Sequence, residues 1–188
     1  MQDTIRTNGR DDNSVWKGLA AGLIGGLVAS WTMNRFQDVW SAVTKGLETR
    51  QGNQETFDTQ ESEFGSTPEV PDDTTVKAAS AVSEGVFGHK LTQSEKKIGG
   101  TAVHYVLGTG VGGLYGAAAE IAPNVTAAAG LPFGAAFWLV VDEGAVPLLG
   151  LSEGPMAYPL STHAYALSSH FVYGLTAEAV RRAVRGAL

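Results

Sequence analysis

Between Lys97 and Arg181 the chain reads IGGTAVHYVLGTGVGGLYGAAAEIAPNVTAAAGLPFGAAFWLVVDEGAVPLLGLSEGPMAYPLSTHAYALSSHFVYGLTAEAV. These 83 residues contain no Lys or Arg and only five carboxylates. A soluble surface needs many charged side chains of both signs, so the stretch predicts helices that lie in a bilayer. Its proline and glycine breaks divide it into three predicted spans, each long enough to cross about 30 Å of hydrocarbon: 98–121, 126–149 and 159–180.

An earlier apolar run, WKGLAAGLIGGLVASWTM from Trp16 to Met33, predicts a first span within residues 15–40. Its tryptophans are placed to anchor a helix at the membrane interface. Residues 1–14 are polar and predict a solvated tail. A cleaved signal peptide is the competing interpretation, but the run is long and no cleavage site follows it.

Residues 41–96 predict an acidic extramembrane loop. Eight carboxylates and one Arg fall between Glu48 and Asp73, a composition that favours a linker without a packed core. Within the loop, TTVKAASAVSEGVF carries apolar residues at spacings of three and four. This spacing predicts a short amphipathic helix over about 74–88, on the membrane surface or against the bundle.

Together these segments predict an all-α protein, a polytopic membrane bundle of four transmembrane helices with an extramembrane loop. Four spans put both termini on one side. The basic residues nearly balance, at six near the termini and seven in the first loop. In the region 97–188, three arginines follow the last span, and an acidic loop can translocate regardless of its charge, so both termini are predicted to be cytoplasmic.

Small residues recur every four positions in the first two spans. The first stripe is Gly18, Gly22, Gly26 and Ser30. The second is Gly100, Gly108, Gly112 and Gly116, with His104 in the gap and Glu120 one step further. Such a glycine zipper lets helix backbones approach closely where lipid gives no hydrophobic drive for association. It also makes a homo-oligomer plausible.

The antiparallel order of the spans, at about 1.5 Å per residue, places five titratable residues in the half of the bilayer nearest the first loop: His104, Asp142, Glu143, His163 and His170. A carboxylate at that depth must be protonated, paired or in contact with water. The candidate partners of the acid pair are His104 and His170. Glu120 and Glu178 lie near the opposite end, where Arg181 and Arg182 are three and four residues past Glu178 and can pair with it.

Several function classes are excluded by composition. Without cysteine there is no disulfide, thiolate zinc site or thiol catalysis. A net charge of −6 argues against a nucleic-acid partner. The chain has no phosphate-binding loop, G-x-S-x-G or H-E-x-x-H motif. No catalytic residue and no metal site is therefore predicted, and an enzyme is the less favoured class.

Three hypotheses remain open. The first is proton or ion handling, or pH sensing, through the buried histidines and carboxylates. The second is a structural or accessory subunit of a larger membrane complex, in which the polar groups only pack. The third is a haem-binding protein, with His104 and either His163 or His170 as ligands. No cofactor is favoured, and the lipid bilayer is the one partner common to all three.

Scattered residues of the three later spans resemble the YagU-like family of bacterial inner-membrane proteins. The residues that carry the resemblance are His104, Tyr115, Glu120, Pro123, Gly130, Gly134, Pro147, Gly150, Leu151, His170, Glu178, Arg181 and Arg182. It covers residues 98–188 and the glycine-rich first span, and the chain departs from the pattern in Asp142, Glu143 and its acidic loop. The resemblance implies a small helical protein of the bacterial cytoplasmic (inner) membrane, of uncharacterised activity.

Overall fold

The computed structural model describes residues 3–52 and 74–188, and the side chains of 14–46 and 74–188. These residues form helices and turns, and none of them forms a strand, so the all-α class is confirmed for this part of the chain. The α-helices are α1 (Asp3–Gly52), α2 (Thr74–Phe87), α3 (Gln93–Ile121), α4 (Leu131–Val140), α5 (Val146–Leu148) and α6 (Leu160–Ala187). Between them lie the 3₁₀ segments η1 (Pro123–Gly130) and η3 (Pro155–Ala157) and the π turn η2 (Val141–Ala145).

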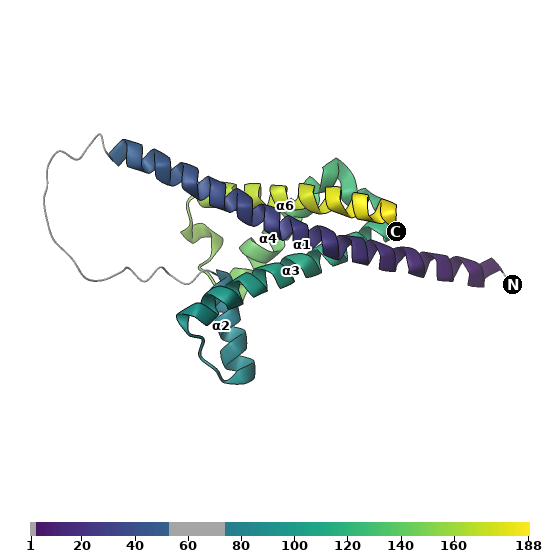
Figure 1. Ribbon diagram of the computed structural model, residues 1–188, viewed down its shortest axis with the longest axis horizontal. Helices are drawn as coiled ribbons and strands as arrows, with labels where there is room; N and C mark the ends of the chain where they lie inside the picture. Colours follow the sequence, from purple (N-terminus) through teal and green to yellow (C-terminus); the bar gives the residue numbers. More distant parts are fainter. Residues whose placement is uncertain (1–2, 53–73) are drawn as a thin grey trace, which may run out of the picture.

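The three longest helices form the body of the molecule. Helix α1 packs against both α3 and α6, while α4 packs on α6 and α2 packs on α3. Figure 1 shows the start of α1 and the end of α6 at one end of the bundle, and α2 at the other. We call these the terminal end and the loop end.

Two helix bounds differ from the sequence-based expectation. Helix α1 begins at Asp3, within the predicted polar tail, and continues to Gly52, beyond the predicted end of the first span at residue 40. The remaining part of the acidic linker, 53–73, lies outside the described residues. Helix α2 occupies Thr74–Phe87, the range in which the spacing predicts a short helix.

The third predicted span, 126–149, is not one continuous helix. Ala128 and Ala129 adopt positive φ, and Gly130 has φ of +86° before α4 begins. A second interruption follows at the π turn. Pro147 lacks the N–H that would bond to the carbonyl of Glu143, and its ring would crowd that carbonyl, so the helix widens there. The backbone N–H of Val146 bonds instead to the carbonyl of Val141, five residues earlier.

One described segment, Pro123–Leu148, is both long and apolar enough to cross a membrane, with 26 residues and a mean hydropathy of 1.5. The other predicted spans do not reach that hydropathy in the described part of the chain. Their stripes of Gly, Ser and Thr contribute little hydropathy even where they sit between apolar residues. A four-span topology therefore does not follow from hydropathy.

The glycine stripes of α1 and α3 pack directly against each other. A Cβ on Gly112 would lie 2.5 Å from the Cα of Gly26 and 2.7 Å from the carbonyl oxygen of Gly22. The contacts step by four residues along both helices in opposite directions, so the close packing predicted from the stripes is confirmed. Gly22 and Gly26 of α1 and Gly112 of α3 therefore contact each other within one chain, and the homo-oligomer stays a prediction.

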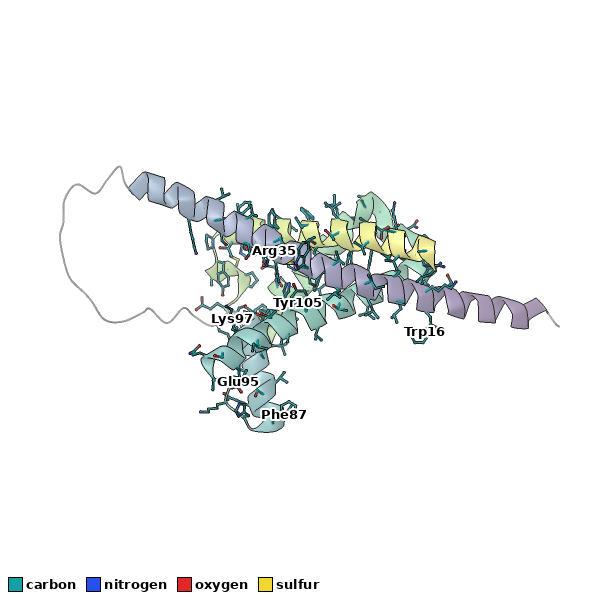
Figure 2. All side chains as sticks on the ribbon, viewed as in Figure 1. Trp16, Arg35, Phe87, Glu95, Lys97 and Tyr105 are labelled. Atoms are coloured by element: carbon teal, nitrogen blue, oxygen red, sulfur yellow. The ribbon has the colours of Figure 1, made fainter. Side chains whose placement is uncertain are left out.

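Few large apolar side chains are buried. Of the residues whose side chains the structure describes, eight hydrophobic ones are buried, and five of these are alanines. By contrast, large apolar side chains project outward along the bundle, among them Leu114, Leu139, Leu148 and Leu160. Figure 2 shows Trp16 and Phe87 standing away from the ribbon at opposite ends. Among the described residues, Met33, Tyr115 and Tyr173 are the buried hydrophobic side chains larger than alanine, and the other large apolar side chains are half-buried or exposed.

The start of α3 is fixed by a reciprocal cap. The backbone N–H of Thr92 donates to the Glu95 carboxylate at 2.8 Å, and the Glu95 N–H donates to the Thr92 hydroxyl. The bond from the Thr92 N–H is the main reason why the pKa of Glu95 is held below its ordinary value. The connection from α2 ends at this cap, and the cap fixes the direction of the first turn of α3.

Candidate functional site

A cavity of about 590 Å³ lies at the loop end, between α1, α3, α6 and the π turn. Among the residues that line it are all five that the sequence placed in the loop-side half of the bilayer: His104, Asp142, Glu143, His163 and His170. His104 and His170, which are 66 positions apart in the chain, therefore line one cavity. Thr74 and Thr75 of α2 line it as well, so the loop also contributes to its wall.

The π turn positions the two acids of the cavity. Asp142 and Glu143 are adjacent in a turn closed by a bond from residue 146 to residue 141. A π turn has more residues per turn than an α-helix, so adjacent side chains diverge less. Both carboxylates consequently face α6, although neighbours in an α-helix would point to different faces.

Glu143 and His163 form a short polar contact between side chains of the cavity wall. The His163 Nδ1 atom lies 2.6 Å from Glu143 Oε1, and the other ring nitrogen, Nε2, lies 3.0 Å from the carbonyl oxygen of Pro155. Both side chains are largely buried. We call this arrangement of Glu143, His163 and the Pro155 carbonyl the latch, because it ties the π turn to the start of α6.

The latch holds a titratable proton. A carbonyl oxygen only accepts, so Nε2 of His163 must carry a hydrogen. The contact between Nδ1 and the Glu143 carboxylate then needs a second proton, on either the imidazole or the carboxyl group. Without it, a nitrogen lone pair would face a carboxylate at 2.6 Å. The geometry of the latch therefore depends on one proton shared between two side chains.

His170 forms the deeper part of the wall. Its Nδ1 atom donates to the carbonyl oxygen of Ala166 at 2.9 Å and lies 3.7 Å from Asp142 Oδ2. The ring is 4% exposed and packs edge-on against Phe137, with centroids 5.1 Å apart. His170 therefore lies close to Asp142, as the sequence predicted for one of the two acids.

The structure corrects the predicted partner of Glu143. The sequence suggested His104 and His170 as the partners, whereas Glu143 pairs with His163. His104 lines the same cavity, and its ring lies edge-on to that of Tyr105 at 5.7 Å. Pro147 was the signal that the third span departs from α-helical geometry, and it could have indicated that the direction of Glu143 is not that of a regular helix.

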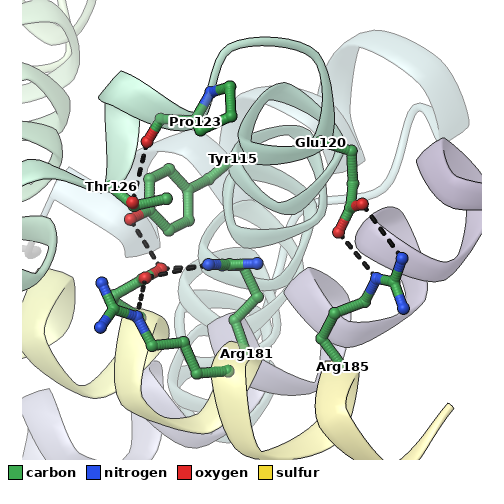
Figure 3. A network of polar contacts seen from close by, with 8 residues as sticks. Tyr115, Glu120, Pro123, Thr126, Arg181 and Arg185 are labelled. Carbon is green, nitrogen blue, oxygen red and sulfur yellow. Dashed lines mark hydrogen bonds and ion pairs between the residues drawn. The ribbon is translucent and has the colours of Figure 1, made fainter.

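A second cluster of polar residues lies at the terminal end (Figure 3). We call it the terminal cluster; it consists of Ser14, Tyr115, Glu120, Glu178, Arg181, Arg182 and Arg185. Glu178 is 1% exposed and accepts two bonds from Arg181, at 2.7 and 2.9 Å. The Tyr115 hydroxyl donates to it at 2.8 Å, and Arg182 donates as well. The predicted pairing of Glu178 with the two arginines is confirmed.

Glu120 is bound by residues that the sequence did not indicate as partners. Arg185 donates to its two carboxylate oxygens at 2.7 and 3.1 Å, and the Ser14 hydroxyl donates to it as well. Ser14 lies four residues before Gly18 and so continues the stripe of α1, as Glu120 continues that of α3. Extending both stripes by one step would have predicted this contact.

An apolar layer separates the cavity from the terminal cluster. Ala29, Met33, Tyr173 and Ala177 are buried together, and Phe133 and Phe137 pack against them. Tyr173 turns its hydroxyl to the backbone, donating to the carbonyl oxygen of Gly108 at 2.5 Å. The histidines of the cavity and the carboxylates of the terminal cluster therefore lie on opposite sides of packed aromatic rings.

Comparison with known proteins identifies a family. A family model described as "Protein of unknown function (DUF1440)" matches residues 74–179, more than half of the chain. No curated protein and no solved structure matches the chain. The matched residues include α2 and the five residues that the sequence placed near the first loop, while the arginines of the terminal cluster lie beyond them.

Proposed function

The chain belongs to the DUF1440 family of proteins of unknown function, and from this premise we propose that it is a proton-responsive membrane protein. Its loop-end cavity takes up and releases a proton at the latch of Glu143, His163 and the Pro155 carbonyl. The single observation that carries this function is the latch geometry, in which both ring nitrogens of His163 face oxygen acceptors. The proposed role is sensing of pH.

The membrane placement is supported by what the bundle buries and what it exposes. Leu148 and Leu160 are 88% and 83% exposed, and the buried contacts between α1 and α3 are made by glycine. Lipid would cover such side chains, and close backbone contact is how helices associate without a hydrophobic drive. In this arrangement α1, α3, the segment Pro123–Leu148 and α6 cross a bacterial cytoplasmic membrane, with both termini in the cytoplasm.

Helix α2 fits the membrane interface in the same arrangement. It runs across the long axis of the bundle at the loop end (Figure 1). Its C-terminal part exposes Val82, Val86 and Phe87. A helix that lies along the membrane surface with its apolar side chains exposed buries them at the boundary between head groups and acyl chains.

Sensing is favoured over transport by the apolar layer. A relay to the terminal cluster would have to carry a proton past Phe133, Phe137 and Tyr173. Glu178 and Glu120 are already paired with arginines, so they are poor proton acceptors at the far end. A proton taken up at the loop end instead changes the latch, and with it the tie between the π turn and α6.

The pH dependence of the latch can be followed by the fluorescence of Trp138. Its ring centroid lies 6.4 Å from that of His163. In a variant with Trp16, Trp31 and Trp40 replaced by phenylalanine, the emission is expected to change between about pH 5 and 8, where histidine titrates in proteins. The latch is intact on the acidic side and opens as pH rises and the shared proton leaves.

The control for this experiment is a second histidine. His163→Gln is expected to abolish the change in Trp138 emission, while His89→Gln leaves it unchanged, because His89 is exposed and pairs with Glu95 outside the cavity. A pH response that survives in His163→Gln would contradict the proposal. The polar groups would then be packing contacts, as expected for a structural subunit.

A further inference from the structure

We propose that the loop-end cavity binds a small organic cation, an ammonium group on an apolar body, in competition with the proton of the latch. This ligand class rests on the proposed function in one respect, since both need a cavity that water reaches from the loop end. The inference is carried by the size of the cavity, the sign of the charges that line it and the aromatic rings beside them.

The cavity is too large for a bare ion. Its volume of about 590 Å³ falls within the range of roughly 300–1,000 Å³ typical of small-molecule sites. The described residues also contain no group of three or more metal-ligating side chains placed to hold a metal ion. An organic molecule of several heavy atoms fits this space better.

The charges that line the cavity favour a cation. No Lys or Arg is among the described residues of its wall. The histidines and carboxylic acids of the wall come from α3, the π turn, the connection to α6 and α6 itself: His104, Asp142, Glu143, Glu153, His163 and His170. Helices α1 and α2 face the cavity with uncharged side chains. With neutral histidines the wall carries up to three negative charges, which an anion would not approach.

Asp142 is placed to receive the ammonium group. Its side chain is 39% exposed, and a carboxylate has about four acceptor positions. Its Oδ2 atom lies 3.7 Å from Nδ1 of His170. Phe137 and Tyr158 also line the cavity, and aromatic rings attract ammonium groups.

Competition with protons follows from the same residues. Protonation of the histidines or the carboxylates adds positive charge where the ammonium group would bind. A cation of fixed charge is therefore expected to bind at least ten-fold more weakly at pH 5.5 than at pH 8. The bound ligand supplies the positive charge that the departing proton removes, so the cavity exchanges one cation for another.

The test is a titration with benzyltrimethylammonium, whose charge does not change with pH, on the full-length protein in lipid nanodiscs. Isothermal calorimetry at pH 8 is expected to give saturable binding, and benzyl alcohol and benzoate at least ten-fold weaker binding. Asp142→Asn is expected to weaken binding of the cation at least ten-fold. Glu84→Gln, an exposed position on α2 outside the cavity wall, is expected to leave it unchanged.

Three results would overturn the ligand class: equal binding of benzyl alcohol, tighter binding of benzoate, or unchanged affinity in Asp142→Asn. Correct folding of this variant is checked by its circular dichroism and by the pH response of Trp138. If that response is intact and the cation does not bind, only the ligand class fails. If the response itself is missing in the parent protein, the proposed function fails.

Discussion

Glu178→Ala is expected to lower the free energy of unfolding by about 3–5 kcal/mol, the usual cost of removing one partner of a buried ion pair. The variant leaves the largely buried guanidinium of Arg181 and the hydroxyl of Tyr115 without the carboxylate that both contact. The measurement is thermal or denaturant unfolding of the purified protein in a mild detergent, followed by circular dichroism.

Two further variants separate this cause from a simple loss of packing. The double variant Glu178→Leu with Arg181→Met removes both buried charges, and it is expected to recover more than half of the lost stability, since the main penalty is an unpaired buried charge. Glu84→Ala removes an exposed carboxylate from α2 and is expected to be near neutral. A double variant as unstable as Glu178→Ala would contradict the explanation.

Gly112→Leu is expected to destabilise the protein by about 3 kcal/mol, at the upper end of the usual cost of overpacking. The new side chain would start 2.5 Å from the Cα of Gly26 and 2.7 Å from the carbonyl oxygen of Gly22. Both contacts are with backbone, which cannot move aside like the end of a flexible side chain. Helices α1 and α3 would have to separate, and the unfolding midpoint in detergent reports the loss.

The matched control lies two residues away on the same helix. A Cβ on Gly110 meets no atom within 4 Å, and leucine is favoured over glycine in a helix by up to about 1 kcal/mol. Gly110→Leu is therefore expected to be neutral or slightly stabilising, opposite in sign to Gly112→Leu. Similar losses in both variants would show that glycine is needed for a reason other than the contact between α1 and α3.

The sequence predicted those parts of the structure that depend on helical spacing alone. The four-residue steps of Gly22 and Gly26 indicate a face that only small residues can form, and this face is the contact of α1 with α3. The positions of Arg181 and Arg182 three and four residues past Glu178 likewise fix their pairing. Such features follow from one helix or two, without knowledge of the whole bundle.

The latch could not be predicted in the same way, because it depends on departures from regular geometry. Pro147 widens the helix into the π turn Val141–Ala145, and the turn at Pro155 places a carbonyl oxygen against His163. The prediction that Glu143 pairs with His104 or His170 assumed a straight helix from 126 to 149. The kink at Ala128 and Ala129 was also missed, since positive φ is rare for alanine and leaves no mark in composition.

We propose that the cavity and the terminal cluster lie toward opposite sides of a membrane. The chain has no cysteine, and Gly154 and Gly186 each have open space around the position of a new Cβ. Gly154→Cys marks the loop end and Gly186→Cys the terminal end. A membrane-impermeant maleimide added to intact bacterial cells that make each variant is predicted to label Gly154→Cys, and to label Gly186→Cys only after the membrane is opened. Equal labelling of the two positions in intact cells, or recovery of the folded protein in the aqueous fraction without detergent, would rule out this membrane placement.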